Sequence, residues 1–290
     1  MRERFAYNHL SVSFLCKHYR LTRQGFYKSR SRRLISRLDR EKLYMLVMEA
    51  RRELPREGCH KLYKRILPKL QKMGIKIGRD GLFKFLRQEG LLVKPKRSFV
   101  KTTNSYHRFY TYSNLIESYR PTGVNQVWVS DITYIRTYQG FMYLALITDA
   151  YSRKIVGYDI SNNLELTGCI KALKKALNQL PGNHQLIHHS DRGLQYCSSV
   201  YQNELEKCNI TPSMTDGYDC YQNALAERIN GILKGEFFMH TCNTAKELKR
   251  LIKESITTYN NKRPHLSLNY KTPNFIHNKK SCEASFTGFS

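Results

Sequence analysis

The chain has 290 residues with 49 Lys and Arg against 23 Asp and Glu, which gives a formal net charge of +26. At roughly 100–200 residues per domain, this length holds one sizeable domain and a smaller one, with enough chain to bury a core. So large a positive excess lies outside the range of ordinary mixed-charge enzymes and favours a polyanionic partner, most commonly nucleic acid. Ribosomal and other basic structural proteins fit the charge alone equally well.

The cysteines and the apolar residues argue against a zinc-binding, disulfide-rich, membrane or secreted protein. The eight cysteines include no C-x-x-C pair, so their spacing suggests neither a zinc ribbon nor a disulfide framework and favours free thiols in a reducing compartment. No apolar run reaches the roughly 18 residues of a membrane span, and the start of the chain lacks the apolar core of a secretion signal. We therefore expect a soluble protein of the cytoplasm.

The positive charge is concentrated in the first part of the chain. Residues 1–120 contain 30 Lys and Arg and 9 Asp and Glu, a net charge of +21, whereas residues 121–290 contain 19 and 14, a net charge of +5. This asymmetry predicts that the first part binds a polyanion and that the second part performs chemistry that needs acidic side chains.

Residues 1–57 are predicted to form a helical segment. Two short helices are expected over residues 11–19 and 22–30, with Thr22 as the N-cap of the second, and a longer helix over residues 33–53. Two short helices joined by a tight turn are a helix-turn-helix signal, and a solvated helical hairpin explains the same pattern.

Residues 58–92 are predicted to form a second helix-turn-helix-like unit that binds DNA. A helix over residues 59–73, interrupted at Pro68, leads into a helix over residues 79–89 that Gly90 ends. In the second helix, Leu82, Phe83 and Leu86 are expected to face inward, and this arrangement places a basic helix in a major groove. The expected DNA contacts on its outer side are Arg79, Lys84 and Arg87. A purely structural three-helix bundle is the alternative.

Residues 93–120 lose regular periodicity and form a basic, aromatic linker. Lys94, Lys96 and Arg97 precede an aromatic run over residues 106–110. A segment of this composition can follow a nucleic-acid backbone, so the three basic residues are predicted DNA contacts. A tether between two domains explains the composition nearly as well.

Residues 121–280 alternate between strand and helix patterns, and residues 281–290 form a tail. Three strands with short turns, over residues 127–135, 141–148 and 154–160, are rich in β-branched and aromatic residues. Further strands are expected over residues 185–189 and 210–214, and helices over residues 164–180, 199–208, 221–238 and 245–260. The pattern predicts an α/β domain with a mixed five-stranded sheet and helices on both faces.

Three acidic residues of this part are candidates for one site. Asp131 lies in the first strand, Asp191 follows the fourth strand, and Glu227 lies on a helix, with 35 residues between the last two. In such a sheet these positions can meet at one edge. Carboxylates are the ligands that Mg²⁺ prefers, and two such ions can catalyse phosphoryl transfer. We therefore predict that Asp131, Asp191 and Glu227 are catalytic and bind metal.

Other polar residues surround these three in the sequence. Lys234 follows Glu227 by two helical turns and would share its face, where it would meet a phosphate; a solvated helix face explains it equally well. Asp149, which ends the second strand, is a rival metal ligand, although we favour a role as acceptor of hydrogen bonds from the next turn. His188 and His189 at a strand end fit a structural role better than a role in phosphate binding or proton transfer.

With these residues the chain resembles retroviral-type integrases and related transposases, which share a DDE triad. The segments over residues 126–135 and 189–196, and the segment Tyr259–His265 with the residues after it, are similar to blocks of the second-frame (OrfB) transposase of the insertion-sequence-three family. The resemblance runs from about residue 58 to residue 275.

The resemblance implies a ribonuclease-H-like integrase core preceded by a small all-α helix-turn-helix region. It also implies Mg²⁺ or Mn²⁺, with two ions when DNA is bound, nicking of element ends, and strand transfer by the freed 3′-hydroxyl. Double-stranded DNA, as element ends and as target, would be the partner of a homo-oligomer associated with the nucleoid. Lys234 matches a basic position after the catalytic Glu, and Lys262 and Arg263 of the third block are expected DNA contacts.

The chain departs from the family pattern in two places and leaves two other functions open. Gln222 stands where many relatives have Asp, and Arg228 stands where a smaller residue is frequent, which bears on substrate detail more than on chemistry. In this family an upstream frame (OrfA) commonly supplies a further DNA-binding module as a partner or fusion. The alternatives are a non-catalytic DNA-binding regulator of transposition and a structure-specific ribonuclease-H-like nuclease.

Overall fold

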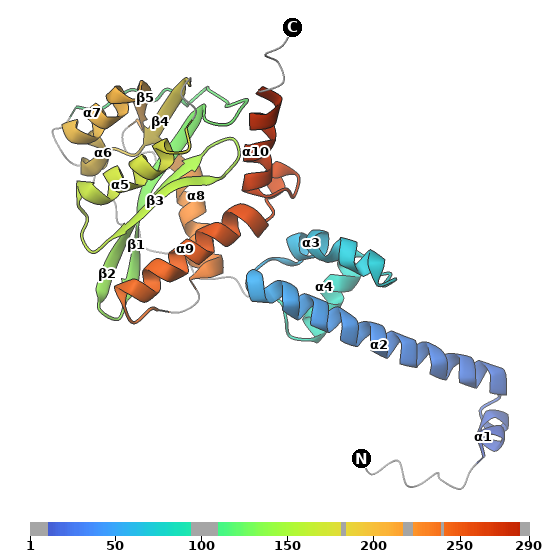
Figure 1. Cartoon of the computed structure of the whole chain (residues 1–290). Coiled ribbons are helices and arrows are strands. Elements are labelled where there is room, and N and C mark those ends of the chain that lie inside the picture. The colour runs from blue at the N-terminus through green and yellow to red at the C-terminus, as the bar shows by residue number, and fades with distance from the viewer. Residues whose placement is uncertain (1–10, 94–109, 181–183, 217–222, 239–240, 285–290) are drawn as a thin grey trace.

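The computed structural model describes residues 11–93, 110–180, 184–216, 223–238 and 241–284. Four helices, α1 (Val12–His18), α2 (Arg23–Glu53), α3 (Cys59–Lys72) and α4 (Arg79–Gln88), come first and form a helical region beside an α/β core (Figure 1). No helix of the described ranges is long and apolar enough to cross a membrane.

The helical region differs from the prediction in where its helices end. The two helices expected over residues 22–30 and 33–53 are one continuous helix, α2, because no Gly or Pro interrupts the chain between them. Thr22 caps this helix as predicted and accepts a hydrogen bond from the Gly25 amide at 3.0 Å. The interruption predicted at Pro68 is also wrong: α3 continues through this residue, which lies on the exposed side of the helix.

The second half of α2 packs against α3 and α4 through a small apolar core. Leu46 and Val47 of α2, Leu62 and Ile66 of α3 and Leu82 of α4 are among its buried members. These contacts confirm that three helices form one packed unit.

The inward face of α4 differs by one residue from the prediction. Phe85 is 5% exposed and joins the core, whereas Phe83 is 40% exposed and lies under the guanidinium of Arg87. The prediction that Phe83 faces inward is therefore wrong, because positions 82, 85 and 86 share one side of a 3.6-residue helix and position 83 does not.

The core contains a mixed five-stranded sheet, as predicted, in the order β3-β2-β1-β4-β5. Strands β1 (Val127–Thr137), β2 (Gly140–Asp149) and β3 (Ile155–Ser161) pair antiparallel, and β4 (Leu186–Ser190) and β5 (Ile210–Met214) continue the sheet in parallel. The helices are α5 (Leu166–Leu177), α6 (Leu194–Cys197), α7 (Ser199–Lys207), α8 (Ala224–Ile232), α9 (Ala245–Lys262) and α10 (Pro273–Ala284).

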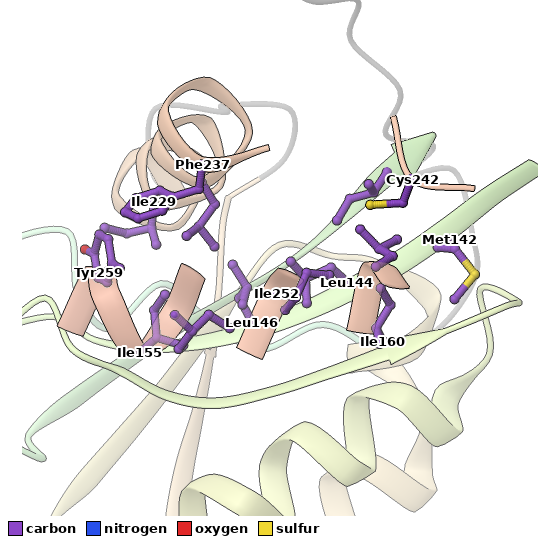
Figure 2. Close-up of a cluster of buried hydrophobic side chains, with 14 of the residues drawn as sticks. Met142, Leu144, Leu146, Ile155, Ile160, Ile229, Phe237, Cys242, Ile252 and Tyr259 are labelled. Atoms are coloured by element: carbon purple, nitrogen blue, oxygen red, sulfur yellow. The ribbon is translucent and has the colours of Figure 1, made fainter. Parts of the chain in front are cut away.

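Helices cover both faces of the sheet, because alternate residues of the central strands are apolar on both sides. Leu144 and Leu146 of β2 pack toward α8 and α9, and Figure 2 shows them with Ile229, Ile252 and Tyr259 in this layer. The opposite face packs against α5, α6 and α7. There α5 approaches β3 so closely that a Cβ on Gly157 would lie 2.2 Å from the carbonyl oxygen of Ala172.

The helical region contacts the core at the C-terminal end of α2. Leu54 is 2% exposed and belongs to the apolar layer between the sheet, α8 and α9. Glu53 forms an ion pair with Lys262 of α9 at 2.5 Å, and His60 hydrogen bonds with the hydroxyl of Tyr270. These contacts place α3 next to the loop after α9.

Candidate active site

The sheet brings Asp131 and Asp191 to one place. In the parallel pair β1–β4, Val129 lies opposite His189, and Asp131 and Asp191 each follow this pair by two residues. Neighbouring strands are about 4.8 Å apart. Asp131 is thus in the middle of β1 and Asp191 directly follows the end of β4, which confirms the predicted neighbourhood of these strands.

Helix α8 is fixed over this point by two asparagines. Asn230 donates from Nδ2 to Oδ2 of Asp131 at 2.7 Å, and Asn223 donates from Nδ2 to the carbonyl oxygen of Ser130 at 3.0 Å. The two asparagines are seven residues apart, so two helical turns place them on one side of α8. Glu227 lies in the first turn of this helix, one turn before Asn230.

The three carboxylates affect one another electrostatically. Burial, with smaller effects from the charges of Asp191 and Glu227, raises the pKa of Asp131 to about 7, although the hydrogen bond from Asn230 opposes the rise. The charges of Asp191 and Glu227 thus act on the carboxyl of Asp131, and Glu227 lies on the helix that Asn230 fixes to Asp131. Within the described ranges, however, no group of three or more His, Cys, Asp or Glu side chains is arranged to hold a metal ion.

Lys234 also lies at this site. It belongs to the π-helical turn Leu233–Phe237 (η2) that continues α8, and it is half-buried. Burial lowers its pKa, and the negative charge of Asp131 opposes this effect. The charges of Lys234 and Asp131 thus act on each other.

Asn230 is a residue of the site that the sequence analysis missed. It is 4% exposed, and its Oδ1 is buried without a hydrogen-bond partner among the described residues. The available signal was its position between Glu227 and Lys234 on one helix face. An asparagine in a sequence does not by itself indicate a catalytic site, however, and its contact with Asp131 appears only once the position of α8 relative to β1 is known.

Asp149, the rival metal ligand, has the fold role that we favoured. Its Oδ1 accepts hydrogen bonds from the amide and the hydroxyl of Ser152 at 2.7 and 2.6 Å, and its Oδ2 accepts from the Asn125 amide at 2.7 Å. The hydroxyl of Ser152 also contacts Nδ1 of His277 at 3.0 Å, which ties α10 to this turn. Asp149 is fully buried, so its oxygens serve the fold.

The paired histidines are buried and bonded to other core residues. His188 contacts the hydroxyls of Ser130 and Tyr201 at 2.7 and 3.0 Å, and His189 contacts the hydroxyl of Ser213 at 2.9 Å. Burial lowers the pKa of His188 to about 3, so its ring is neutral. The structure thus supports the structural role over phosphate binding.

The predicted DNA contacts fall into three groups. Arg79, Lys84 and Arg87 are exposed on α4, and Arg79 pairs with Asp80 at 2.9 Å. Lys262 and Arg263 are engaged within the protein: Lys262 pairs with Glu53, and the buried Arg263 forms a two-point ion pair with Glu236 at 2.6 and 2.7 Å. The third group, Lys94, Lys96 and Arg97, lies outside the described residues.

Comparison with known proteins identifies the core. Two family models match, both described as "Integrase core domain", over residues 121–220 and 208–273. The chain is 40% identical to the "Insertion element IS600 uncharacterized 31 kDa protein" of Shigella sonnei over 215 residues, which are 72% of this chain and 78% of that protein. It is 32% identical to "Transposase InsF for insertion sequence IS3A" of Escherichia coli (strain K12) over 231 residues, 78% of this chain and 79% of that protein.

Among solved structures, the chain is similar to the HTLV-2 integrase catalytic core domain in complex with magnesium. The similarity has 21% identity and a TM-score of 0.44 and covers 55% of this chain and 99% of that one. The two long matches to insertion-sequence proteins and the two core models identify the family. The chain belongs to the insertion-sequence-three family of DNA transposases, polynucleotidyl transferases with an integrase-like, ribonuclease-H-like core.

Proposed function

We propose that Asp131, Asp191 and Glu227 are the catalytic carboxylates and that they bind Mg²⁺ or Mn²⁺, with two ions when DNA is bound. The observation that supports this most directly is geometric: β4, which ends before Asp191, pairs with the strand of Asp131, and Asn230 hydrogen bonds Asp131 from the helix that carries Glu227. Groups of like charge that are held together in a partly buried place are typical of functional sites, because the fold gains nothing from their repulsion.

The residues of the site fit a divalent cation. The three carboxylates supply hard oxygen donors, and the pKa of Asp131, which burial raises first and the charges of Asp191 and Glu227 raise as well, shows that its ionised form lacks compensation that a cation would supply. The buried Oδ1 of Asn230 is a further oxygen without a partner in the described ranges, and such an atom costs about 1–3 kcal/mol unless something binds it. When bound, a divalent cation at these carboxylates would polarise a phosphate and activate the attacking oxygen.

The protein's own side chains have separable roles in this proposal. Asn230 holds the carboxylate of Asp131 through Oδ2 and so fixes its orientation. Because the pKa of Asp131 is about 7, this carboxyl is partly protonated at neutral pH, and binding of a cation must displace that proton. Lys234 would bind an oxygen of the phosphate that reacts, since its ammonium group lies in reach of the charge of Asp131.

The proposed reaction is nicking at the element ends by water, followed by attack of the freed 3′-hydroxyl on target DNA. The partners are therefore double-stranded DNA, as element end and as target, and further copies of this chain assembled on that DNA. We also propose that an upstream-frame polypeptide acts with the chain as a partner or fusion, and that the complex acts at the nucleoid. Arg79, Lys84 and Arg87 of α4 would bind DNA there, because the outer face of this helix is basic and exposed.

A cleavage and joining assay tests this proposal. Labelled DNA ends from beside the reading frame are incubated with the protein, a target plasmid and Mg²⁺, Mn²⁺ or a chelator, with and without the upstream-frame product. Asp131→Asn, Asp191→Asn and Glu227→Gln are compared with Glu254→Gln, a matched control on the exposed face of α9. We expect nicked and joined products only with metal and only from the parent and the control.

Two outcomes would change the assignment. Folded triad variants that nick and join as well as the parent would show that the catalytic residues lie elsewhere. Nicked products without joined ones, from every form of the protein, would favour the structure-specific nuclease.

A further inference from the structure

The structure contains a large cavity between the helical region and the core that no step of the proposed reaction uses. Its volume is about 1170 Å³, and it is bounded by α3, the start of β1, α8 and the loop after α9. Of its described lining residues one, Glu117, is acidic, and six are cationic: Lys61, Arg120, Arg153, Arg228, Arg263 and Lys271.

Within the described ranges, five of these six cations form no ion pair with an acidic side chain. Arg263 is neutralised by its two-point pair with Glu236, but none of the ion pairs in the part of the chain that the structure describes involves Arg120, Lys271, Lys61, Arg153 or Arg228. Burial lowers the pKa of Lys61, the charges of Arg263 and Arg228 act in the same direction, and the charges of Glu236 and Glu57 oppose them. Burial likewise lowers the pKa of Arg153, the charge of Arg228 acts in the same direction, and Tyr259 and Asp149 oppose it. The cavity thus holds cations that repel one another, and two of them, Lys61 and Arg153, are partly removed from water.

The cavity and the carboxylates lie on opposite sides of the same short helix. At 100° per residue, positions 224, 225, 228, 229 and 232 share one side of α8, and they line the cavity. Positions 227, 230 and 234 lie on the other side, with Asp131. Consecutive residues of the chain, Glu227 and Arg228, therefore point to the catalytic site and to the cavity.

Folding alone gives no reason to keep such a group of charges. Partly buried cations without acidic partners cost free energy, and they remain where a ligand of opposite charge binds. The lining also contains Tyr119 and Tyr151, and aromatic rings beside cations are the usual means of binding single-stranded nucleic acid. The volume slightly exceeds the range of about 300–1,000 Å³ for small-ligand sites, so it fits a few linked groups and not a whole duplex.

We propose that this cavity binds the phosphates of a single-stranded segment of the DNA substrate, through Lys61, Arg153 and Arg228. This rests on the proposed function, in which nicking at an element end frees a strand beside the carboxylates. Arg228 then places the strand relative to Glu227, and Lys61 of α3 couples strand binding to the contact between the helical region and the core.

Metal-free binding measurements test this proposal separately from catalysis. Anisotropy of a labelled single-stranded oligonucleotide is measured in chelator over a range of salt concentrations, for the parent, Arg228→Gln and the double variant Arg153→Gln with Arg228→Gln. The control removes the same charge from the exposed side of α9, as Lys246→Gln with Lys249→Gln. We expect Kd to rise about 10-fold for each arginine removed from the cavity, which corresponds to about 1.4 kcal/mol.

The salt dependence gives a second, independent value. Each phosphate of a single strand that a protein neutralises adds about 0.7 to the steepness of log K against log salt, so the double variant should show a slope shallower by about 1.4. The α9 control should change neither quantity. Equal affinity and slope in the double variant and the control would overturn the proposal.

Thermal unfolding separates a binding role from a structural one. If the cations serve a ligand, Arg228→Gln relieves repulsion, so the melting temperature of the protein without DNA should rise or stay constant while DNA binding weakens. A fall in the melting temperature together with unchanged binding would contradict the proposal. Arg228 is exposed, so its variant is expected to fold even if the double variant does not.

Two further arms identify the ligand and separate the proposals. Inorganic tripolyphosphate should compete with the oligonucleotide, and Asp131→Asn should bind the oligonucleotide as the parent does. If the cavity variants lose tripolyphosphate binding but keep full oligonucleotide binding, the site serves a free polyphosphate and the DNA proposal is wrong. Because no metal is present, loss of nicking in the catalytic assay leaves this result unaffected.

Discussion

The two sides of α8 carry clusters of opposite charge, an acidic side with the three carboxylates and a cationic side with the residues of the cavity. On one side, Asp131, Asp191 and Glu227 hold negative charge together, and the amide of Asn230 satisfies a single oxygen. On the other, Lys61 and Arg228 form no ion pair with any acidic side chain that the structure describes.

Elsewhere in the described part of the chain, several cations are paired with acidic side chains. Arg65 binds Glu57 at 2.9 Å and Glu53 at 3.1 Å, and the buried Arg263 binds Glu236. The contrast teaches that a cluster of like charges without ion pairs indicates a binding site, whereas a charge that is paired within the fold does not. The acidic cluster then indicates a metal site, and the cationic cluster indicates a phosphate site.

The largest effect is expected at the acidic side. Asp131→Asn should lower the rates of nicking and joining by at least about 1,000-fold, which is about 4 kcal/mol of transition-state stabilisation, because an amide replaces a metal-binding carboxylate. Single-turnover assays measure the rates, and circular dichroism verifies the fold. A folded variant within 10-fold of the parent would remove Asp131 from the site.

Replacing the paired cation Arg263 should lower the stability of the protein, whereas replacing Arg228 should not. Arg263→Gln leaves Glu236 without its partner, and loss of one member of a buried ion pair costs roughly 3–5 kcal/mol. Urea denaturation should show that loss, whereas Arg228→Gln should cost nothing. If both variants lose the same stability, the distinction between the two kinds of cation fails.

Asn230 should matter to rate more than to stability. Residues that orient a metal ligand typically change activity by about 10–100-fold, so Asn230→Ala should lower the nicking rate by that factor. Asn178→Ala, at the exposed end of α5, is the control and should leave the rate unchanged. If Asn230 served only the fold, the variant would lose stability and keep its rate once folded.

The smallest expected effect is the pH dependence that the cationic side imposes on His265. Burial lowers the pKa of this histidine to about 2, and the charges of Arg263, Lys61, Arg153 and Arg228 act in the same direction. Below about pH 6.5 the unfolded chain binds a proton there that the folded protein does not, so stability is full above that pH and falls as the pH drops toward 2.

His265 should contribute about 1.4 kcal/mol per pH unit to the slope of the free energy of unfolding against pH. His265→Asn should remove that share of the slope, measured by urea denaturation between about pH 6.5 and 5. An unchanged slope in the variant would show that His265 takes up its proton in the folded state as well.

Much of the acidic side could be predicted from sequence, because it depends on local patterns. Alternating apolar residues predicted strand β1 around Asp131, and the strand that ends before Asp191 was expected beside it. Topology then predicted that the two residues meet, and the structure confirms that their strands, β1 and β4, are neighbours.

The cationic side could not be predicted in this way. Lys61 comes from α3 and Arg228 from α8, and only the packing of the end of α2 on the core brings them to one cavity. The sequence could mark Arg228 as unusual without giving a reason for it. Asn230 was missed for a related cause, since its role depends on how α8 lies across β1.

The central claim is that three carboxylates form one metal site, and Mn²⁺ binding tests it most directly. Electron paramagnetic resonance of the full chain with an element-end DNA counts bound Mn²⁺ for the parent, Asp131→Asn, Asp191→Asn, Glu227→Gln and the control Glu254→Gln. The account predicts that each triad variant loses bound Mn²⁺ while the control retains it. Full Mn²⁺ binding by all three folded triad variants would contradict the account.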